Sequence, residues 1–200
     1  MKNPIQLLAE GIIPLLGFYY WNWSWAFILF FYFIDWFAKE VLLHLKSRKI
    51  IETHGGNAAK ETRLKQGLFS FLFLALTIFF SCLTLYKQTT SFDLFAEIQQ
   101  FLLYKEMGIA QGFILIPIIA LGIIMQYKME FIKQKLFLKL NVQRIWKQHN
   151  HKNRALLILV ILGYGVSLVF KTPEIIMLIT AVISPLIYQF VILRLYRAQN

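Results

Sequence analysis

Long runs of apolar residues, separated by short polar segments, are the dominant pattern of this sequence. Within the runs, apolar residues follow one another without the spacing of an amphipathic helix or strand. A helix needs about 20 apolar residues to cross the hydrocarbon core of a bilayer. The pattern therefore predicts an all-α polytopic membrane protein, with residues 1–200 forming one domain. The expected spans are at about residues 4–20, 25–45, 67–86, 108–127, 155–170 and 174–193, which pair into three hairpins.

The composition excludes several other classes of protein. Hydrophobic residues make up 58% of the chain and charged residues 16%, whereas average globular chains have roughly 45–50% and 25%. A soluble enzyme and a disordered chain do not fit these values. The single cysteine, Cys82, cannot form an intrachain disulfide, so a disulfide scaffold is also excluded. A transmembrane β-barrel would show alternating segments of about 10 residues, and the sequence has none.

The basic residues predict an orientation in the membrane. Of the 21 Lys and Arg residues, 17 fall at the N-terminus, in the second and fourth connections and at the C-terminus. Only Lys87, Lys105 and Lys171 fall on the opposite side, and Lys39 lies inside a span. Because Lys and Arg are retained in cytoplasmic loops, we expect both termini to be cytoplasmic, in a plasma membrane of the bacterial inner-membrane type. The net charge of +11 is thereby explained by topology rather than by binding to nucleic acid.

Two segments outside the spans have the spacing of amphipathic helices. Phe95, Ile98, Phe101 and Leu102 follow a capping sequence at residues 90–93 and predict an external helix at the membrane interface. On the cytoplasmic side, an apolar stripe lies among lysines and predicts either an extension of the fourth span or a helix on anionic lipid. Its residues are Met129, Ile132, Leu136 and Leu140.

The ionisable residues to examine within the first two predicted spans are Glu10, Asp35, Lys39 and Glu40. If the first hairpin turns near Trp23, Glu10 and Asp35 lie at the same depth. Lys39 is one turn from Asp35, and His44 is one turn from Glu40, so each pair can interact along one helix face. We consider three interpretations of this layer: a proton or cation site, a structural polar cluster and a contact with a partner subunit. In the structural interpretation, Glu10 and Glu40 reach water at the cytoplasmic ends of their helices.

The sequence shows no convincing catalytic, metal or cofactor site. His149 and His151 have a chelating spacing, but no nearby Cys, Asp or Glu completes a set of metal ligands. Ser81 and Cys82 have no histidine on their side of the membrane, so a nucleophile would lack its base. We therefore expect no enzyme activity. Polar residues within the spans, such as Thr77 and Ser81, are expected to form hydrogen bonds between helices.

Part of the chain resembles an uncharacterised family of small bacterial and archaeal membrane proteins. The similarity covers the Pro14, Leu15, Leu16, Gly17 segment, the aromatic corner at residues 21–24, the segment Tyr32 to Trp36, and Arg154 with the apolar run that follows it. That family typically has a Tyr-Trp-x-Glu-Asn motif, in which Asp35 would occupy the glutamate position. Phe33 and Trp36 depart from the motif, and the resemblance covers about a third of the chain. It implies a membrane topology and a role for Asp35, but no activity.

Two functions are consistent with these features. The first is an accessory or structural subunit of a larger membrane complex, whose partners are the lipid bilayer and other membrane proteins. The alternative is a small proton- or cation-coupled transporter or channel that uses Glu10, Asp35, Lys39 and Glu40.

Overall fold

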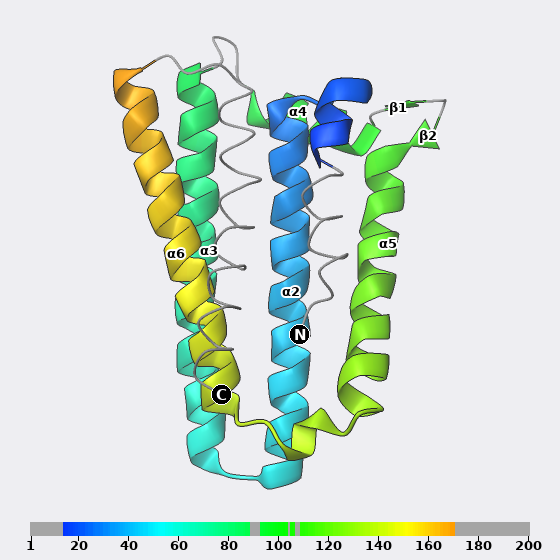
Figure 1. Ribbon diagram of the computed structural model, residues 1–200, viewed down its shortest axis with the longest axis vertical. Helices are drawn as coiled ribbons and strands as arrows, with labels where there is room; N and C mark the ends of the chain where they lie inside the picture. Colours follow the sequence, from blue (N-terminus) through cyan, green and yellow to red (C-terminus); the bar gives the residue numbers. More distant parts are fainter. Residues whose placement is uncertain (1–13, 89–92, 104, 107–108, 171–200) are drawn as a thin grey trace, which may run out of the picture.

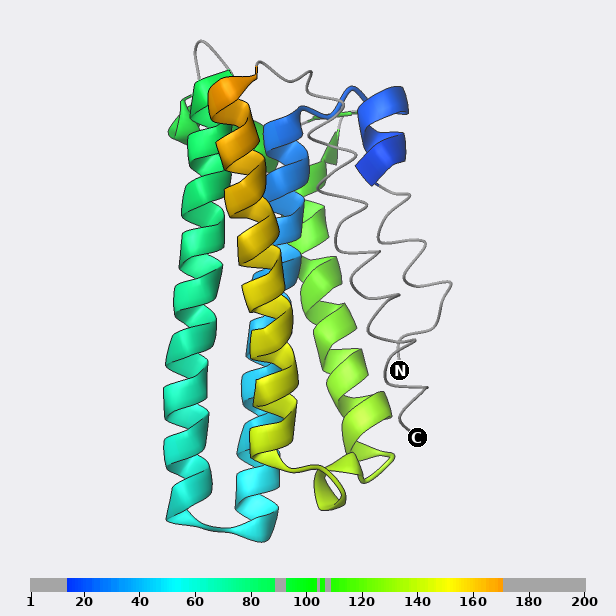
Figure 2. The same ribbon diagram turned by 60° about the vertical axis from the view of Figure 1, so that its left-hand side comes forward.

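The computed structural model describes residues 14–88, 93–103, 105–106 and 109–170. Within them, long helices run alternately up and down (Figure 1). They are α2 (Trp25–His54), α3 (Asn57–Gln88), α5 (Gln111–Met125) and α6 (Val142–Val169). Helices α3 and α6 lie side by side in both views, and α2 lies between this pair and α5 (Figures 1 and 2).

The connections at the two ends of the bundle are set by local sequence signals. Ser24 caps α2, since its hydroxyl accepts a hydrogen bond of 3.1 Å from the Phe27 amide. Gly55 and Gly56 connect α2 to α3 with positive φ angles of 71° and 106°, which residues with a side chain rarely adopt. Asn141 caps α6 by accepting a 2.8 Å hydrogen bond from the Gln143 amide. These caps explain why the helices begin and end where they do.

One end of the bundle, at the top of Figure 1, carries the short helix at residues 14–20, helix α4 (Leu94–Leu103) and a small hairpin. The hairpin pairs β1 (Lys105–Glu106) with β2 (Ile109–Ala110). Asp93 caps α4 through a 2.9 Å hydrogen bond from the Phe95 amide. Phe101 is buried against Phe27, with ring centroids 4.7 Å apart. The predicted helix in this segment is therefore confirmed.

At the opposite end, the segment between α5 and α6 is compact and irregular. It consists of the π-helix η1 (Gln126–Ile132) and the 3₁₀ helix η2 (Leu136–Leu138), separated by Lys135 with a φ of 52°. Phe131 is 1% exposed and packs in one cluster with Ile50 and Trp146. The predicted extension of the fourth span is confirmed as far as Ile132, since η1 follows directly on α5. The apolar stripe does not continue to Leu140 as one helix, because the turn at Lys135 redirects the chain and places Leu136 and Leu140 against the cluster with Ile50 on α2.

The all-α fold is confirmed for the described residues, apart from the two-residue strands. The predicted bounds were too short for three helices, since α2 continues to His54, α3 begins at Asn57 and α6 begins at Val142. Two segments, Asn57–Lys87 and Phe113–Ile132, are long and apolar enough to cross a membrane. The sixth expected span and most of the first lie outside the described residues, so the six-span topology and its orientation stay predictions.

Candidate functional site

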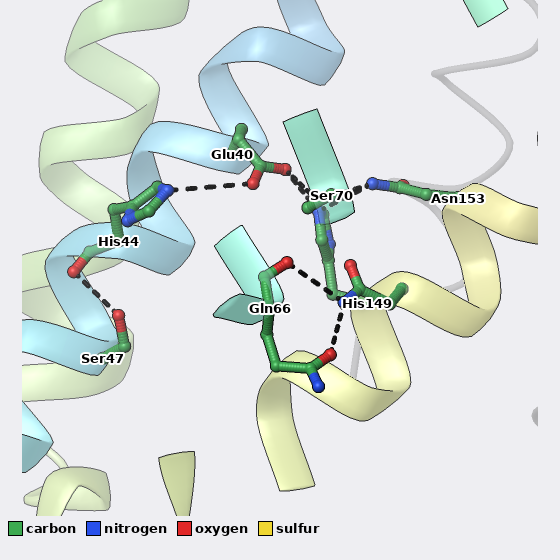
Figure 3. A network of polar contacts seen from close by, with 8 residues as sticks. Glu40, His44, Ser47, Gln66, Ser70, His149 and Asn153 are labelled. Atoms are coloured by element: carbon green, nitrogen blue, oxygen red, sulfur yellow. Dashed lines mark hydrogen bonds and ion pairs between the residues drawn. The ribbon is translucent and has the colours of Figure 1, made fainter. Parts of the chain in front are cut away.

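A buried carboxylate, Glu40, lies at the junction of α2, α3 and α6 (Figure 3). The residue is 6% exposed. Its Oε2 atom lies 2.6 Å from Nε2 of His149 on α6 and accepts a 2.8 Å hydrogen bond from the Ser70 hydroxyl on α3. Because buried polar groups are costly without partners, these contacts hold three helices in one register.

Asn153 closes this arrangement from α6. Its Nδ2 atom donates to the Ser70 hydroxyl at 2.9 Å and lies 3.1 Å from His149 Nε2. We refer to Glu40, Ser70, His149 and Asn153 as the Glu40 network. Each pair of neighbours in the network is within hydrogen-bond distance, so the side chains fix one another's orientation.

A further polar contact is made by Asn150, which lies between His149 and Asn153 along α6. Asn150 is 6% exposed and donates through Nδ2 to the Gln66 side chain at 2.7 Å and to the Gln66 backbone carbonyl at 3.2 Å. Figure 3 shows Gln66 beside the Glu40 network. Gly67 allows α3 to approach both neighbouring helices, since a Cβ atom at this position would lie 2.9 Å from a ring carbon of His44 on α2 and 3.5 Å from Trp146 on α6. The contact between α3 and α6 is thus polar near the N-terminal ends of the two helices.

Some buried polar atoms in this region have no hydrogen-bond partner. They include Oε1 of Glu40, Oδ1 of Asn150 and Nε1 of Trp146. Nε2 of His44 lies 3.9 Å from Glu40 Oε1, beyond hydrogen-bond distance. An unpaired buried oxygen costs far more in a charged carboxylate than in a neutral carboxylic acid.

A second polar site lies on another face of α2. Asp35 and Lys39 form an ion pair one turn apart and are each about one-quarter exposed. They line a groove of about 360 Å³ between α2 and the α5–η1 segment, together with Gln126 and Glu130. We refer to this space as the Asp35 groove. It places charged and amide groups within an otherwise apolar part of the bundle.

The four site residues predicted from the sequence do not lie together in the structure. The Asp35–Lys39 pair and the Glu40–His44 interaction occur as expected. Glu40 does not join Asp35 and Lys39, because it faces α3 and α6. The expectation that Glu40 reaches water is also wrong, since α2 continues for a further 14 residues and the side chain is buried. Glu10 lies outside the described residues.

Sequence reasoning missed His149, Ser70 and Asn153 as partners of Glu40. A signal for α6 was present, since Trp146, His149 and Asn153 have the spacing of one helix face. The expectation of interhelical bonds was wrong for Thr77 and Ser81, whose hydroxyls donate to carbonyls of their own helix at 2.7 and 2.8 Å. In the described part of the chain, no group of three or more His, Cys, Asp or Glu residues could hold a metal ion.

Comparisons with protein-family models, curated proteins and solved structures found no match. The resemblance to an uncharacterised membrane-protein family therefore rests on the Pro14–Gly17 segment, residues 21–24, the segment Tyr32 to Trp36, and Arg154 with the apolar run that follows it.

Proposed function

We propose that this chain is an integral membrane protein that crosses the bilayer six times, with both termini in the cytoplasm. The apolar α3 and α5–η1 segments support this proposal. The positions of the basic residues also support it, because those of the second and fourth connections surround the α2–α3 turn and the α5–α6 segment. These two connections lie at the same end of the bundle (Figure 1). Because loops rich in Lys and Arg stay on the cytoplasmic side of the membrane, this end of the bundle is the cytoplasmic end.

Within the membrane, the protein serves as an accessory subunit of a larger complex. The Asp35 groove is the observation that carries this proposal. Charged groups at membrane depth do not face lipid, because the hydrocarbon core cannot solvate them. The groove is open in the described structure, and the most apolar 18-residue stretch of Phe113–Ile132 has no buried residues. A helix of another subunit that covers the groove would shield Asp35 and Lys39 and hold α5 in place, and a groove covered instead by the expected spans at about residues 4–20 and 174–193 of this chain would contradict this role.

The test is affinity purification from the native membrane in a mild detergent, followed by native mass determination. We expect a stoichiometric partner with the wild-type chain and its loss from the double variant Asp35→Leu/Lys39→Leu. The matched control is Arg48→Leu/Glu52→Leu, which removes an exposed i,i+4 ion pair of 2.9 Å from the same helix. A wild-type chain that purifies alone would refute the subunit proposal, as would equal partner recovery with the groove variant.

A second function, proton- or cation-coupled transport, is favoured by the charges that line the groove. Asp35, Lys39 and Glu130 border the same open space, which could admit water and ions. In this case the purified chain carries a flux in proteoliposomes, and Asp35→Asn abolishes it. Absence of flux from the purified wild-type chain would remove this function.

A further inference from the structure

A second groove lies at the end of the bundle that carries the basic connections. It has a volume of about 390 Å³ and is formed by the last turns of α2, the start of α3 and the connection from η2 to α6. His54 on α2 and Lys139 after η2 line this space, and none of the described residues that line it is acidic. Nε2 of His54 donates a 2.9 Å hydrogen bond to the Phe137 carbonyl, which joins α2 to η2. We refer to this space as the Lys139 groove, and its charge complements an anion.

The connection between η1 and α6, which forms one wall of the groove, carries several lysines. Lys133, Lys135 and Lys139 are exposed, and among the described residues none of the three forms an ion pair. Glu52, an acidic residue in the last turn of α2, is already paired with two basic residues of its own helix. The connection therefore presents positive charge that is available to a ligand.

The position of this connection along the chain favours a lipid over a soluble anion. The apolar segment Phe113–Ile132 has 20 residues, about the number that a helix needs to cross the hydrocarbon core. The lysines that follow it, from Lys133, then lie at the level of the phospholipid headgroups. Leu138 lines the groove and is 50% exposed, and Met129 on η1 is 52% exposed. Exposed apolar side chains among lysines match a ligand that has both a charged group and acyl chains.

We propose that the Lys139 groove binds the headgroup phosphate of one anionic phospholipid from the cytoplasmic leaflet. The Lys139 ammonium group pairs with a phosphate oxygen. Lys135 adds positive charge from the same turn, since its carbonyl accepts a 3.1 Å hydrogen bond from the Leu138 amide. Leu138 contacts the acyl chains. This inference rests on the proposed membrane location and orientation of the chain, and it is independent of the subunit role and of the Asp35 groove.

The test is native mass spectrometry of the full chain in a mild detergent, with phosphatidylglycerol or phosphatidylcholine added. We expect the wild-type chain to bind a first phosphatidylglycerol more tightly than phosphatidylcholine. A lysine near an anionic headgroup contributes about fivefold in affinity, so Lys135→Gln/Lys139→Gln should weaken phosphatidylglycerol binding about 25-fold. The matched control is Lys65→Gln/Lys147→Gln, which removes the same charge from exposed positions of α3 and α6 outside the groove and should leave the affinity unchanged.

Equal weakening in the two double variants would overturn the proposal, because binding would then follow net charge alone. Displacement of the bound lipid by an equal concentration of glycerol phosphate would also overturn it, since the ligand would be a soluble phosphate. Leu138→Gln should weaken phosphatidylglycerol binding, and unchanged binding would assign the groove to a phosphate group without acyl chains.

Extraction of native membranes with alkaline carbonate separates this proposal from the proposed membrane location. A wild-type chain that is released without detergent is not an integral membrane protein, and both proposals are then wrong. A chain that stays in the membrane, but whose phosphatidylglycerol binding does not depend on Lys135 and Lys139, refutes the lipid site alone.

Discussion

Glu40 and His149 are 109 positions apart in the sequence, and Nε2 of His149 lies 2.6 Å from Oε2 of Glu40. This contact joins the first and the last of the described long helices. With Ser70 on α3, it forms a polar centre that no single helix could satisfy. The relationship makes Glu40 the residue on which the packing of α2, α3 and α6 depends.

Removal of the Glu40 carboxyl group should destabilise the protein strongly. Glu40→Ala leaves the buried Ser70 hydroxyl and the partly buried His149 ring without their partner, and a buried polar group left without a hydrogen bond costs about 1–3 kcal/mol. Glu40→Gln keeps an oxygen and should cost less. Thermal unfolding in detergent checks this order, with Glu52→Ala as an exposed control that changes stability by about 0–1 kcal/mol. Equal effects of Glu40→Ala and Glu52→Ala would contradict the role of the network.

Alanine substitutions at two glycines should have different effects on stability. A Cβ atom added at Gly163 would have no other atom within 4 Å, so Gly163→Ala should stabilise α6 by about 0.5–1 kcal/mol through helix propensity. Gly67→Ala places a methyl group 2.9 Å from the His44 ring and 3.5 Å from Trp146. The clash should cancel or reverse the gain. Unfolding midpoints of the two variants are the measurement, and equal stabilisation would show that α3 packs differently here.

Helix α4 should be held by one of its phenylalanines and not by another. Phe101 is 3% exposed against α2, whereas Phe95 is 78% exposed. Phe101→Ala should therefore increase hydrogen exchange of the α4 amides, since burial of a phenylalanine contributes about 3–5 kcal/mol relative to alanine. Phe95→Ala should leave this exchange unchanged in detergent. Similar exchange in both variants would argue against the observed docking of α4.

Glu97 should make stability depend on pH. Burial raises the pKa of its carboxyl group above the ordinary value of 4.5. The folded state then binds protons more readily than the unfolded state, so stability increases as pH falls from the raised pKa towards 4.5. Glu97→Gln should remove this increase and stabilise the protein at neutral pH. Unfolding measured across this range checks the sign, and a wild-type profile identical to that of Glu97→Gln would contradict it.

Hydropathy predicted the helical class and located the apolar centres of the helices, but it placed several helix ends too early or too late. It reports where a helix can meet lipid, whereas helix propensity and caps determine where it stops. Helix α2 ends at His54 because Gly55 and Gly56 adopt positive φ angles, nine residues beyond the predicted span. The polar stretch from Val142 to Arg154 belongs to α6 because the Asn141 side chain caps the helix there, before the predicted span begins.

The candidate site was predictable only where its partners are close in sequence. The Asp35–Lys39 pair and the Glu40–His44 interaction follow from the i,i+4 spacing. The contact of Glu40 with His149 depends on how α2 and α6 are arranged in space. Helical periodicity places residues on a face of one helix, but it does not say which other helix that face meets.

The proposed subunit role is tested most directly by a photoreactive amino acid in the Asp35 groove. Introduced at Ile119, which lines the groove, it should crosslink to another protein chain in the native membrane. The control position is Leu72 on α3, which is 49% exposed and outside the groove. We expect an interchain product from Ile119 and none from Leu72. A product with lipid alone, or a crosslink within the chain, would contradict the proposal that another subunit covers the groove.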